Sequence, residues 1–455
     1  MKKIEKRTVV CLFLPLVLLL GLGLFVLRFF LHGGEWASFA ANRHLYNSNG
    51  SLAVGRVLDR DGDVLSWVDE SGSRRYYSGA TVRKATLHAV GDPSGAIGTS
   101  ALVAFADRLS GYNLLTGADN PFGRGNDLYL TLDARLNYVA YRAMNGKKGA
   151  VGVYNYKTGE ILCMVSAPAF DPADPPAIED GDSRYEGVYL NRFLSGTFTP
   201  GSVFKTVTLT AAIENMPDLF SRSFTCTGST TVGGEEITCP FAHGDMDISS
   251  ALANSCNGVF AQLAAELGPD VLSKYVEKAG LLDSCSVDGI STAKGSFDLT
   301  DAAAGQIGWS GVGQYNDLVN PCAVMMWMGA IANQGRTAVP YLILKTEGGL
   351  PSLPRLTKRT GRLIDADTAQ AVGGLMANNV RQTYGSGNFP NMDICAKSGT
   401  AEVGGGKQPT ALFAGFLRNP DAPYAFVVVL EEGGSGANAA SGVAAKVLDA
   451  LVNGY

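Results

Sequence analysis

Apolar side chains dominate residues 9–31, directly after a short segment, residues 1–8, in which four Lys and Arg residues outnumber a single Glu. About 20 apolar residues cross a bilayer as a helix. No small-residue cleavage site follows this run, so we expect an uncleaved membrane anchor rather than a cleaved signal peptide. Pro15, Gly21 and Gly23 suit a membrane helix better than a buried soluble one. Because cationic flanks stay in the cytoplasm, the pattern predicts a cytoplasmic tail and places the rest of the chain outside the cell membrane.

Residues 32–146 are polar and rich in glycine, with short runs of alternating apolar and polar positions such as 64–68 and 128–132. Alternation with a period of two is typical of strands that bury one face. We therefore expect a small, mainly β pedestal domain between the membrane and a larger domain, residues 147–455.

The larger domain begins with two apolar runs, 150–154 and 161–165, which flank a Lys-Thr-Gly turn and predict a β-hairpin. Near the C-terminus, three strand-like runs precede a helical pattern, at residues 394–403, 411–417, 424–430 and 443–452 respectively. Helical periodicity fills the region between, at residues 203–215, 250–267, 271–279, 323–333 and 365–379. Strands at both ends with helices between them predict one antiparallel sheet of the α+β class.

The chain of 455 residues is 46% hydrophobic and 17% charged, with a formal net charge of −5. This composition supports a large folded core. No cluster of Lys and Arg with interleaved aromatic residues is present, so we do not expect nucleic-acid binding.

Seven of the eight cysteines lie beyond the membrane segment, so at least one of them lacks a disulfide partner. Cys226 and Cys239 flank a glycine-rich stretch that could fold back as a hairpin. This predicts a disulfide between them, with two free thiols as the equal alternative. Cys163 and Cys395 lie on apolar strand faces and are expected to stay reduced. No Cys-x-x-Cys pair and no His-rich cluster occurs, so we expect neither a metal site nor a cofactor.

The strongest local motif runs from Ser202 to Lys205, where a loop with Gly196 and Pro200 leads into an apolar helix. Residues three apart share one face of a helix, so the Ser202 hydroxyl and the Lys205 amine are expected to point to the same place. A serine hydroxyl is a poor nucleophile until a base takes its proton. A lysine can be that base once burial or nearby positive charge lowers its pKa from about 10.4.

A second Ser-x-x-Lys, from Ser291 to Lys294, lies between Gly289 and Gly295. A helix that would align the two side chains is not expected between these glycines, and we interpret the segment as an exposed loop. A chain of this length contains about two Ser-x-x-Lys patterns by chance. The pattern alone is therefore weak evidence for an active site.

Two further motifs supply polar groups for such a site. Ser255-Cys-Asn257 follows a helical segment and offers a hydroxyl and an amide, suited to relaying a proton and holding a peptide. Residues 397–400, Lys-Ser-Gly-Thr, lie on a predicted strand and offer a cation, two hydroxyls and a glycine that lets a substrate approach the backbone. The plainer alternatives are a helix cap for the first motif and an ordinary edge strand for the second.

In this order, the three motifs resemble those of the penicillin-recognising serine enzymes. The similarity covers most of the chain from Gly55 onward and is closest to the monofunctional class B penicillin-binding proteins. The segments that carry it besides the motifs are residues 55–62, 157–162, 166–172, 243–244 and 331–335, with Pro340. The resemblance implies a transpeptidase domain with a five-stranded antiparallel sheet flanked by helices. Residues 32–146 are too short for the glycosyltransferase module of bifunctional relatives.

The resemblance also implies a reaction. Ser202 would attack a D-Ala-D-Ala stem peptide of the cell wall, release D-Ala and pass the acyl group to the amine of a neighbouring stem peptide. Lys205 would act as the base toward Ser202, Ser255 would relay the proton, and Asn257 would orient the substrate.

Residues of the 397–400 motif would bind the terminal carboxylate of the peptide: Lys397 as a lasting cation, with the hydroxyls of Ser398 and Thr400 beside Gly399. The family more commonly has Thr at the position of Ser398, and the serine keeps the hydroxyl group. The backbone N–H groups of Ser202 and Thr400 would form the oxyanion hole.

The partners implied by the resemblance are stem peptides, β-lactam antibiotics that acylate the serine, and a membrane-embedded glycan polymerase of the division or elongation machinery. One alternative is a D,D-carboxypeptidase or β-lactamase-like hydrolase, which needs a deacylating base that we do not find between Ser255 and Lys397. Another is a non-catalytic β-lactam sensor or scaffold. A sensor needs additional membrane helices and a cytoplasmic output module, and an inactive scaffold would not need both Lys205 and Lys397. A Ser-His-Asp hydrolase is disfavoured, because His243 is the one histidine of the larger domain and is expected to be structural.

Overall fold

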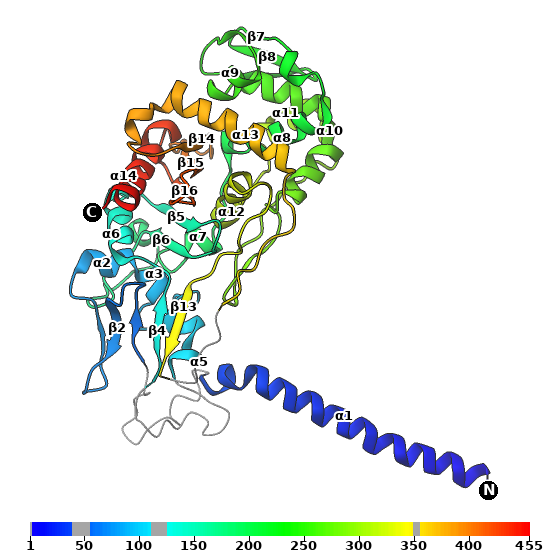
Figure 1. The fold of residues 1–455 in the computed structure, drawn as a ribbon, viewed down its shortest axis with the longest axis vertical. Coiled ribbons are helices and arrows are strands. Elements are labelled where there is room, and N and C mark those ends of the chain that lie inside the picture. The colour runs from blue at the N-terminus through cyan, green and yellow to red at the C-terminus, as the bar shows by residue number, and fades with distance from the viewer. Residues whose placement is uncertain (1, 39–54, 111–124, 349–354) are drawn as a thin grey trace.

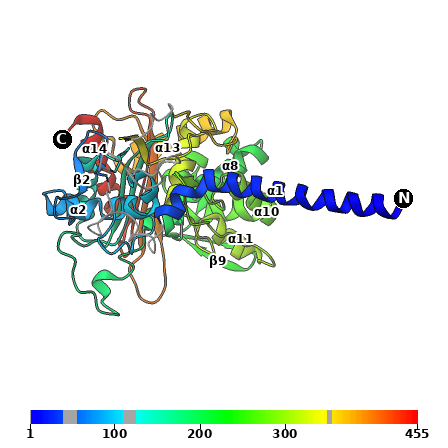
Figure 2. The ribbon, with the colours of Figure 1, turned by 90° about the horizontal axis from the view of Figure 1, so that it is seen from below.

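The computed structural model describes residues 2–38, 55–110, 125–348 and 355–455. Its first element is the long helix α1 (Lys2–Ser38), which projects away from the folded body (Figures 1 and 2). Within it, Phe13–Leu31 has a mean hydropathy of 2.5 and no buried side chains. Among the described residues, this is the one helix long and apolar enough to span a membrane, which fits membrane anchoring.

The larger domain is built on five antiparallel strands in the order β14-β15-β16-β5-β6. Their bounds are Ile394–Ala401, Thr410–Leu417, Tyr424–Leu430, Gly149–Asn155 and Ile161–Ala167, in that order. β16 pairs directly with β5, so Val427 lies opposite Gly152. The prediction that both ends of the domain complete one antiparallel sheet is therefore confirmed.

Helices cover both faces of this sheet, because alternate residues of its buried strands point in opposite directions. Val151 and Val153 of β5 pack on one face with α6 (Ala134–Met144) and α14 (Ser441–Asn453). Ala150 and Tyr154 point to the other face, into the core that includes α12 (Pro321–Ala332).

The helical region on this second face differs from the predicted boundaries at one functionally important place. The pattern at 250–267 is divided into α9 (Ile248–Ala253) and α10 (Asn257–Lys278). Ser255 lies in the break with a φ of 53°, a left-handed conformation that a helix does not accommodate. The pattern at 271–279 continues α10 beyond a kink at Gly268, where φ is 77°. The other helices here are α8 (Lys205–Asn215), α11 (Ala304–Gly311) and α13 (Ala366–Asn379).

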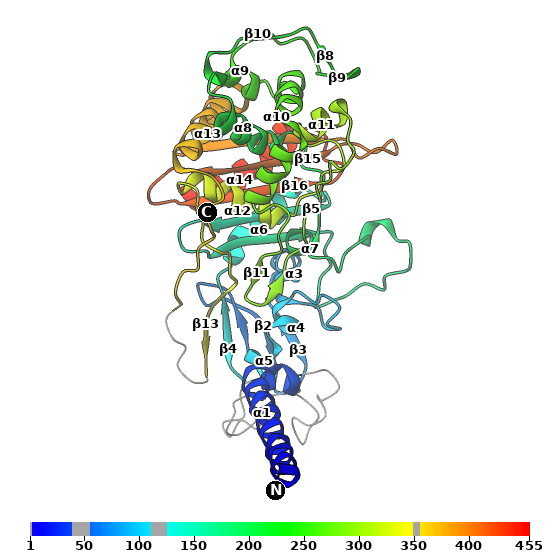
Figure 3. The ribbon, with the colours of Figure 1, turned by 90° about the vertical axis from the view of Figure 1, so that its right-hand side faces the viewer.

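Four short strands pack against α9, α10 and α11 at the end of the molecule farthest from α1 (Figures 1 and 3). They are β7 (Phe224–Cys226), β8 (Ser229–Val232), β9 (Glu235–Thr238) and β10 (Gly244–Met246). β8 pairs with β9 as a hairpin, and β7 pairs with β10, so that Cys226 lies opposite Gly244. The glycine-rich stretch therefore folds back as the sequence predicts.

The pedestal has a five-stranded sheet in the order β13-β4-β1-β2-β3. Its strands β1, β2, β3 and β4 are Val57–Leu58, Val64–Val68, Arg74–Tyr76 and Asp127–Leu130. The edge strand β13 (Ile343–Glu347) comes from far outside the range 32–146 and pairs antiparallel with β4. Parts of the predicted pedestal, residues 39–54 and 111–124, lie outside the described residues.

Short elements complete the described chain. Near the pedestal these are α2 (Ala80–Ala85), α3 (Leu87–Val90), α4 (Ala101–Ala104) and α5 (Ala106–Leu109). In the larger domain they are η2 (Ser183–Tyr185), α7 (Arg192–Ser195), η3 (Gly201–Val203), η4 (Leu219–Ser221), β11 (Ser286–Val287), β12 (Ile290–Ser291), η5 (Val380–Tyr384), η6 (Ser386–Asn388) and η7 (Gly436–Ala440).

Candidate active site

Ser202 lies in the single turn η3, directly before α8, which Lys205 begins. Gly201 has a φ of 52°, which favours glycine. A Cβ atom at this position would also come within 3.0 Å of the Thr400 carbonyl oxygen. The turn therefore packs directly against β14. Within the described part of the chain, the half-buried Ser202 hydroxyl makes no hydrogen bond, which leaves it available to a substrate.

Lys205 is completely buried, and its amine is held by the segment between α9 and α10. Nζ donates to the Ser255 carbonyl oxygen at 2.6 Å and to Asn257 Oδ1 at 2.7 Å, and it lies 3.3 Å from Ser255 Oγ. Burial disfavours the charged amine and lowers the pKa of Lys205 to about 7. A substantial fraction of this amine is therefore neutral near neutral pH and able to accept a proton.

Lys397 on β14 reaches the same hydroxyl from the opposite side. Its Nζ donates to Ser255 Oγ at 2.9 Å and to the Ser398 carbonyl oxygen at 3.0 Å. The Ser255 hydroxyl thus lies between two buried amines. Burial and the charge of Lys205 hold the pKa of Lys397 well below its usual value. This lowered pKa differs from the prediction that Lys397 stays a cation. A carboxylate bound beside Lys397 would favour its charged form.

The Asn257 amide is engaged at both ends within the protein. Its Oδ1 accepts from Lys205, and its Nδ2 donates to the Thr238 carbonyl oxygen at 2.8 Å. Asn257 therefore connects the candidate base to the end of β9. The predicted contact between Asn257 and a substrate would have to replace or share one of these bonds.

The 397–400 motif lies on β14 as predicted, and its polar groups have protein partners. Tyr384 donates its hydroxyl proton to Ser398 Oγ at 2.9 Å and accepts from the Ser398 N–H at 2.8 Å. Thr400 Oγ1 accepts from the Gly436 N–H at 3.2 Å. A Cβ atom at Gly399 would lie 2.7 Å from the Pro200 carbonyl oxygen, so this glycine lets β14 approach the Ser202 turn itself.

A groove of about 370 Å³ adjoins this end of β14. Gln314, one of its lining residues, donates from Nε2 to the Thr400 carbonyl oxygen at 3.2 Å. The other lining residues are Glu235, Gln306, Trp309, Tyr315 and Glu402. Neither Gln314 nor Tyr384 belongs to a short motif, and nothing in the sequence marked them as part of the site.

The structure differs from the predictions for the cysteines in two respects, their pairing and their capacity to bind a metal ion. Cys226 and Cys239 are both free, so the predicted disulfide between them is wrong, although Cys163 and Cys395 are free and buried as expected. The hairpin does fold back, but it directs Cys239 toward a third cysteine: its Sγ lies 3.8 Å from Cys256 Sγ.

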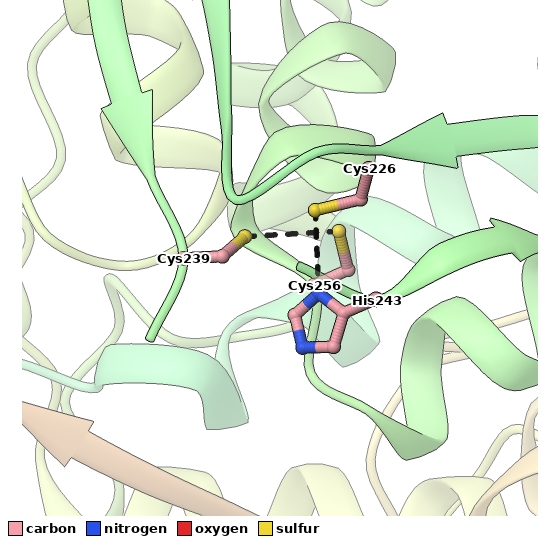
Figure 4. Close-up of side chains that lie close together, drawn as sticks. All are labelled: Cys226, Cys239, His243 and Cys256. Carbon is pink, nitrogen blue, oxygen red and sulfur yellow. Dashed lines mark hydrogen bonds between the residues drawn. The ribbon is translucent and has the colours of Figure 1, made fainter. Parts of the chain in front are cut away.

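We predicted no metal site because the sequence has no Cys-x-x-Cys pair and no His-rich cluster. The tertiary structure instead gathers Cys226, Cys239, Cys256 and His243 into one cluster, in which all four potential ligand atoms lie within 4.8 Å of one another (Figure 4). His243 Nδ1 lies 3.4 Å from Cys226 Sγ. A group of this composition could hold a metal ion.

The family model "Penicillin binding protein transpeptidase domain" matches residues 149–453. The peptidoglycan D,D-transpeptidase PbpA of Mycolicibacterium smegmatis is 29% identical over 369 residues, covering 75% of this chain and 73% of that protein. The peptidoglycan D,D-transpeptidase MrdA of Salmonella typhimurium is 28% identical, covering 73% of this chain and 60% of that protein.

Solved structures are similar over most of the molecule. A ceftriaxone acyl-enzyme complex of penicillin-binding protein A from M. tuberculosis superposes with a TM-score of 0.77 at 22% identity, covering 88% of this chain and 98% of that one. The D,D-transpeptidase domain of a peptidoglycan glycosyltransferase from Eggerthella lenta gives a TM-score of 0.74 at 25% identity, covering 88% and 98%. The predicted fold is therefore confirmed.

Proposed function

This chain belongs to the penicillin-binding protein transpeptidase family, and we propose on that basis that it cross-links peptidoglycan as a D,D-transpeptidase with Ser202 as its nucleophile. The family match confirms the resemblance seen in the sequence motifs. One observation carries the assignment of roles: the Ser255 hydroxyl lies within 2.9 Å and 3.3 Å of two buried lysine amines that come from different segments. Such an arrangement can move a proton between the amines and a reacting serine.

In the first step, Ser202 Oγ attacks the carbonyl carbon that joins the two D-Ala residues of a stem peptide. The neutral amine of Lys205 takes the hydroxyl proton. As the peptide C–N bond breaks, the leaving amine of the terminal D-Ala receives a proton by way of Ser255. An ester on Ser202 remains. Lys397 binds the carboxylate of the leaving D-Ala, and the backbone N–H groups of Ser202 and Thr400 face the developing oxyanion.

In the second step, the amine of a neighbouring stem peptide attacks this ester. The new amide C–N bond forms, the bond from the carbonyl carbon to Ser202 Oγ breaks, and the serine oxygen recovers a proton. A β-lactam acylates the same serine when its ring C–N bond opens. Its amine stays tethered to the acyl group, so the ester persists.

The groove beside Thr400 supports a peptide-sized ligand. It combines aromatic surface from Trp309 and Tyr315 with the carboxylate of Glu402, and its Gln314 bonds to the carbonyl oxygen of Thr400 in the 397–400 motif. Aromatic surface beside hydrogen-bonding side chains suits a peptide, which offers both apolar and polar groups.

The proposal is tested by the intact mass of the full chain after exposure to penicillin. We expect one covalent adduct per chain, located on Ser202 by peptide mapping and absent from Ser202→Ala. An adduct that persists for hours supports a transpeptidase, whereas rapid loss of the adduct as hydrolysed penicillin would identify a β-lactamase-like hydrolase. No adduct at all would favour a non-catalytic scaffold.

We further propose that α1 anchors the protein with residues 1–8 in the cytoplasm and the transpeptidase domain outside, where it works beside a membrane-embedded glycan polymerase. The cationic residues that precede the apolar segment support this orientation. Protease added to intact spheroplasts should digest the domain beyond the membrane segment, and complete protection of that domain would contradict the orientation.

A further inference from the structure

Three cysteines and one histidine meet beside the candidate active site, each from a different place in the fold (Figure 4). Cys226 ends β7, Cys239 follows β9, His243 precedes β10, and Cys256 precedes α10. We propose that these four side chains are the ligands of one zinc ion, and that this ion positions the Ser255-Cys256-Asn257 segment.

The spacing of the ligand atoms fits tetrahedral zinc. Zn–S bonds of about 2.3 Å and Zn–N bonds of about 2.0–2.1 Å set neighbouring ligand atoms about 3.5–3.8 Å apart. Two contacts in the cluster measure 3.8 Å, between the sulfurs of Cys239 and Cys256, and 3.4 Å, between Cys226 Sγ and His243 Nδ1, and all four ligand atoms lie within 4.8 Å of one another. A disulfide requires about 2.05 Å between sulfurs, and all three cysteines are free.

The donor set also favours zinc. Three thiolates and one imidazole make a closed site of the Cys₃His type, with no position left for water, and soft sulfur ligands in tetrahedral geometry select zinc over magnesium or calcium. Binding releases the three thiol protons and leaves the site with one net negative charge. A disulfide within the cluster could use only two of the three cysteines, whereas a metal ion satisfies all of them.

The histidine is oriented for this role. Its Nδ1 faces the sulfurs (Figure 4). The ring of Phe241 packs against the His243 ring edge to face, with the ring centroids 4.6 Å apart. His243 Nε2 has no hydrogen-bond partner among the described residues. Among these residues, the ring nitrogens therefore contact the protein only through Nδ1, which faces Cys226 Sγ in the cluster.

The cluster is connected to the catalytic groups through two segments. Cys256 lies between Ser255 and Asn257, and Cys239 follows Thr238, whose carbonyl oxygen accepts from Asn257 Nδ2. A metal ion bound by both cysteines would hold both of these segments. The first segment carries both oxygens to which Lys205 Nζ donates, Ser255 O at 2.6 Å and Asn257 Oδ1 at 2.7 Å. The ion would also maintain the left-handed backbone of Ser255, which a non-glycine residue keeps only when its surroundings enforce it.

The metal content of the full chain is the first test. After purification in detergent without chelator, elemental analysis should find one zinc per chain. Cobalt substitution should give the intense near-ultraviolet absorption of thiolate-bound Co²⁺. Cys226→Ser and His243→Ala should each lower the zinc content, whereas Cys285→Ser, which alters a free cysteine outside the cluster, should keep one zinc.

The wild-type chain provides the second test, since a ligand variant may fail to fold. Removing the metal with a chelator should lower the rate of acylation by a fluorescent penicillin on the order of 10–100-fold, the usual range for groups that support a metal site. Adding Zn²⁺ back should restore the rate.

Three results would overturn the proposal. Wild-type protein that binds no zinc when zinc is supplied, or a disulfide among the three cysteines in a non-reducing peptide map, would eliminate the site. An acylation rate that is unchanged after complete zinc removal would eliminate the positioning role. These outcomes are separate from the proposed function, because a zinc-loaded chain that penicillin never acylates would overturn the function and leave the site in place.

Discussion

Two segments of this chain share the pattern Ser-x-x-Lys and differ in almost everything else. Ser202 lies in a turn before a buried helix, and Lys205 is fully buried with its amine held by Ser255 and Asn257. Ser291 ends the short strand β12, and both it and Lys294 are exposed. The second segment contains a strand residue, not the simple loop expected, but it forms no helix.

Ser-x-x-Lys spacing therefore does not by itself turn a lysine into a base. A lysine in water holds its proton strongly, and desolvation is what brings the pKa of Lys205 to about 7. The groups around its amine, Ser255, Asn257 and Phe260, come from the break before α10 and from α10 itself, far from the motif in sequence. Paired substitutions at the two segments test this conclusion.

The largest difference is expected between the two serines. Ser202→Ala should abolish acylation by a fluorescent penicillin, because no other hydroxyl is proposed to attack. Ser291→Ala should acylate at the wild-type rate. Labelling followed by gel fluorescence measures both, and full labelling of Ser202→Ala would remove this serine from the mechanism.

The two lysines should differ almost as much. Arginine keeps the charge but cannot give up its proton in a protein. Lys205→Arg should therefore lower the second-order acylation rate constant by about 10²–10⁴-fold, as is typical for loss of a positioned base. Lys294→Arg is the matched control and should change nothing. Equal rates for the two variants would show that burial of Lys205 has no role in the chemistry.

Lys397→Arg separates the two buried amines. If Lys397 mainly provides charge for a substrate carboxylate, arginine should preserve part of its role, and the loss of acylation should be smaller than for Lys205→Arg at the same pH. The bulkier guanidinium in a fully buried position accounts for the expected loss. A loss as large as that of Lys205→Arg would mean that Lys397 also transfers a proton.

The pH dependence of acylation by the wild type tests the protonation of Lys205 most directly. Below its pKa of about 7, Lys205 is protonated and cannot accept the serine proton. Acylation of the wild type should therefore fall about tenfold for each pH unit below that value and level off above it. Stopped-flow acylation from pH 5 to pH 9, with Lys294→Arg as the control, provides the measurement. A flat profile would contradict Lys205 as the base.

Much of the fold and of the candidate site could be predicted from local pattern. Apolar runs marked the hairpin that begins the large sheet and the three strands that complete it. The apolar run before residue 31 marked the helix α1. The three motifs also supplied Ser202, Lys205 and Lys397, because residue type and spacing on one element are local properties that a sequence displays directly.

Only the tertiary structure decided how distant segments meet. It broke the predicted helix at 250–267 with the left-handed Ser255, added β13 to the pedestal sheet, and placed Tyr384 against Ser398. It also replaced the predicted disulfide by a cluster in which Cys256 joins Cys239. These contacts depend on which surfaces of the folded chain pack together, and a short stretch of sequence does not show which surfaces those are. The motif around Ser202 was therefore visible in the sequence, while the burial that lowers the pKa of Lys205 was decided by packing.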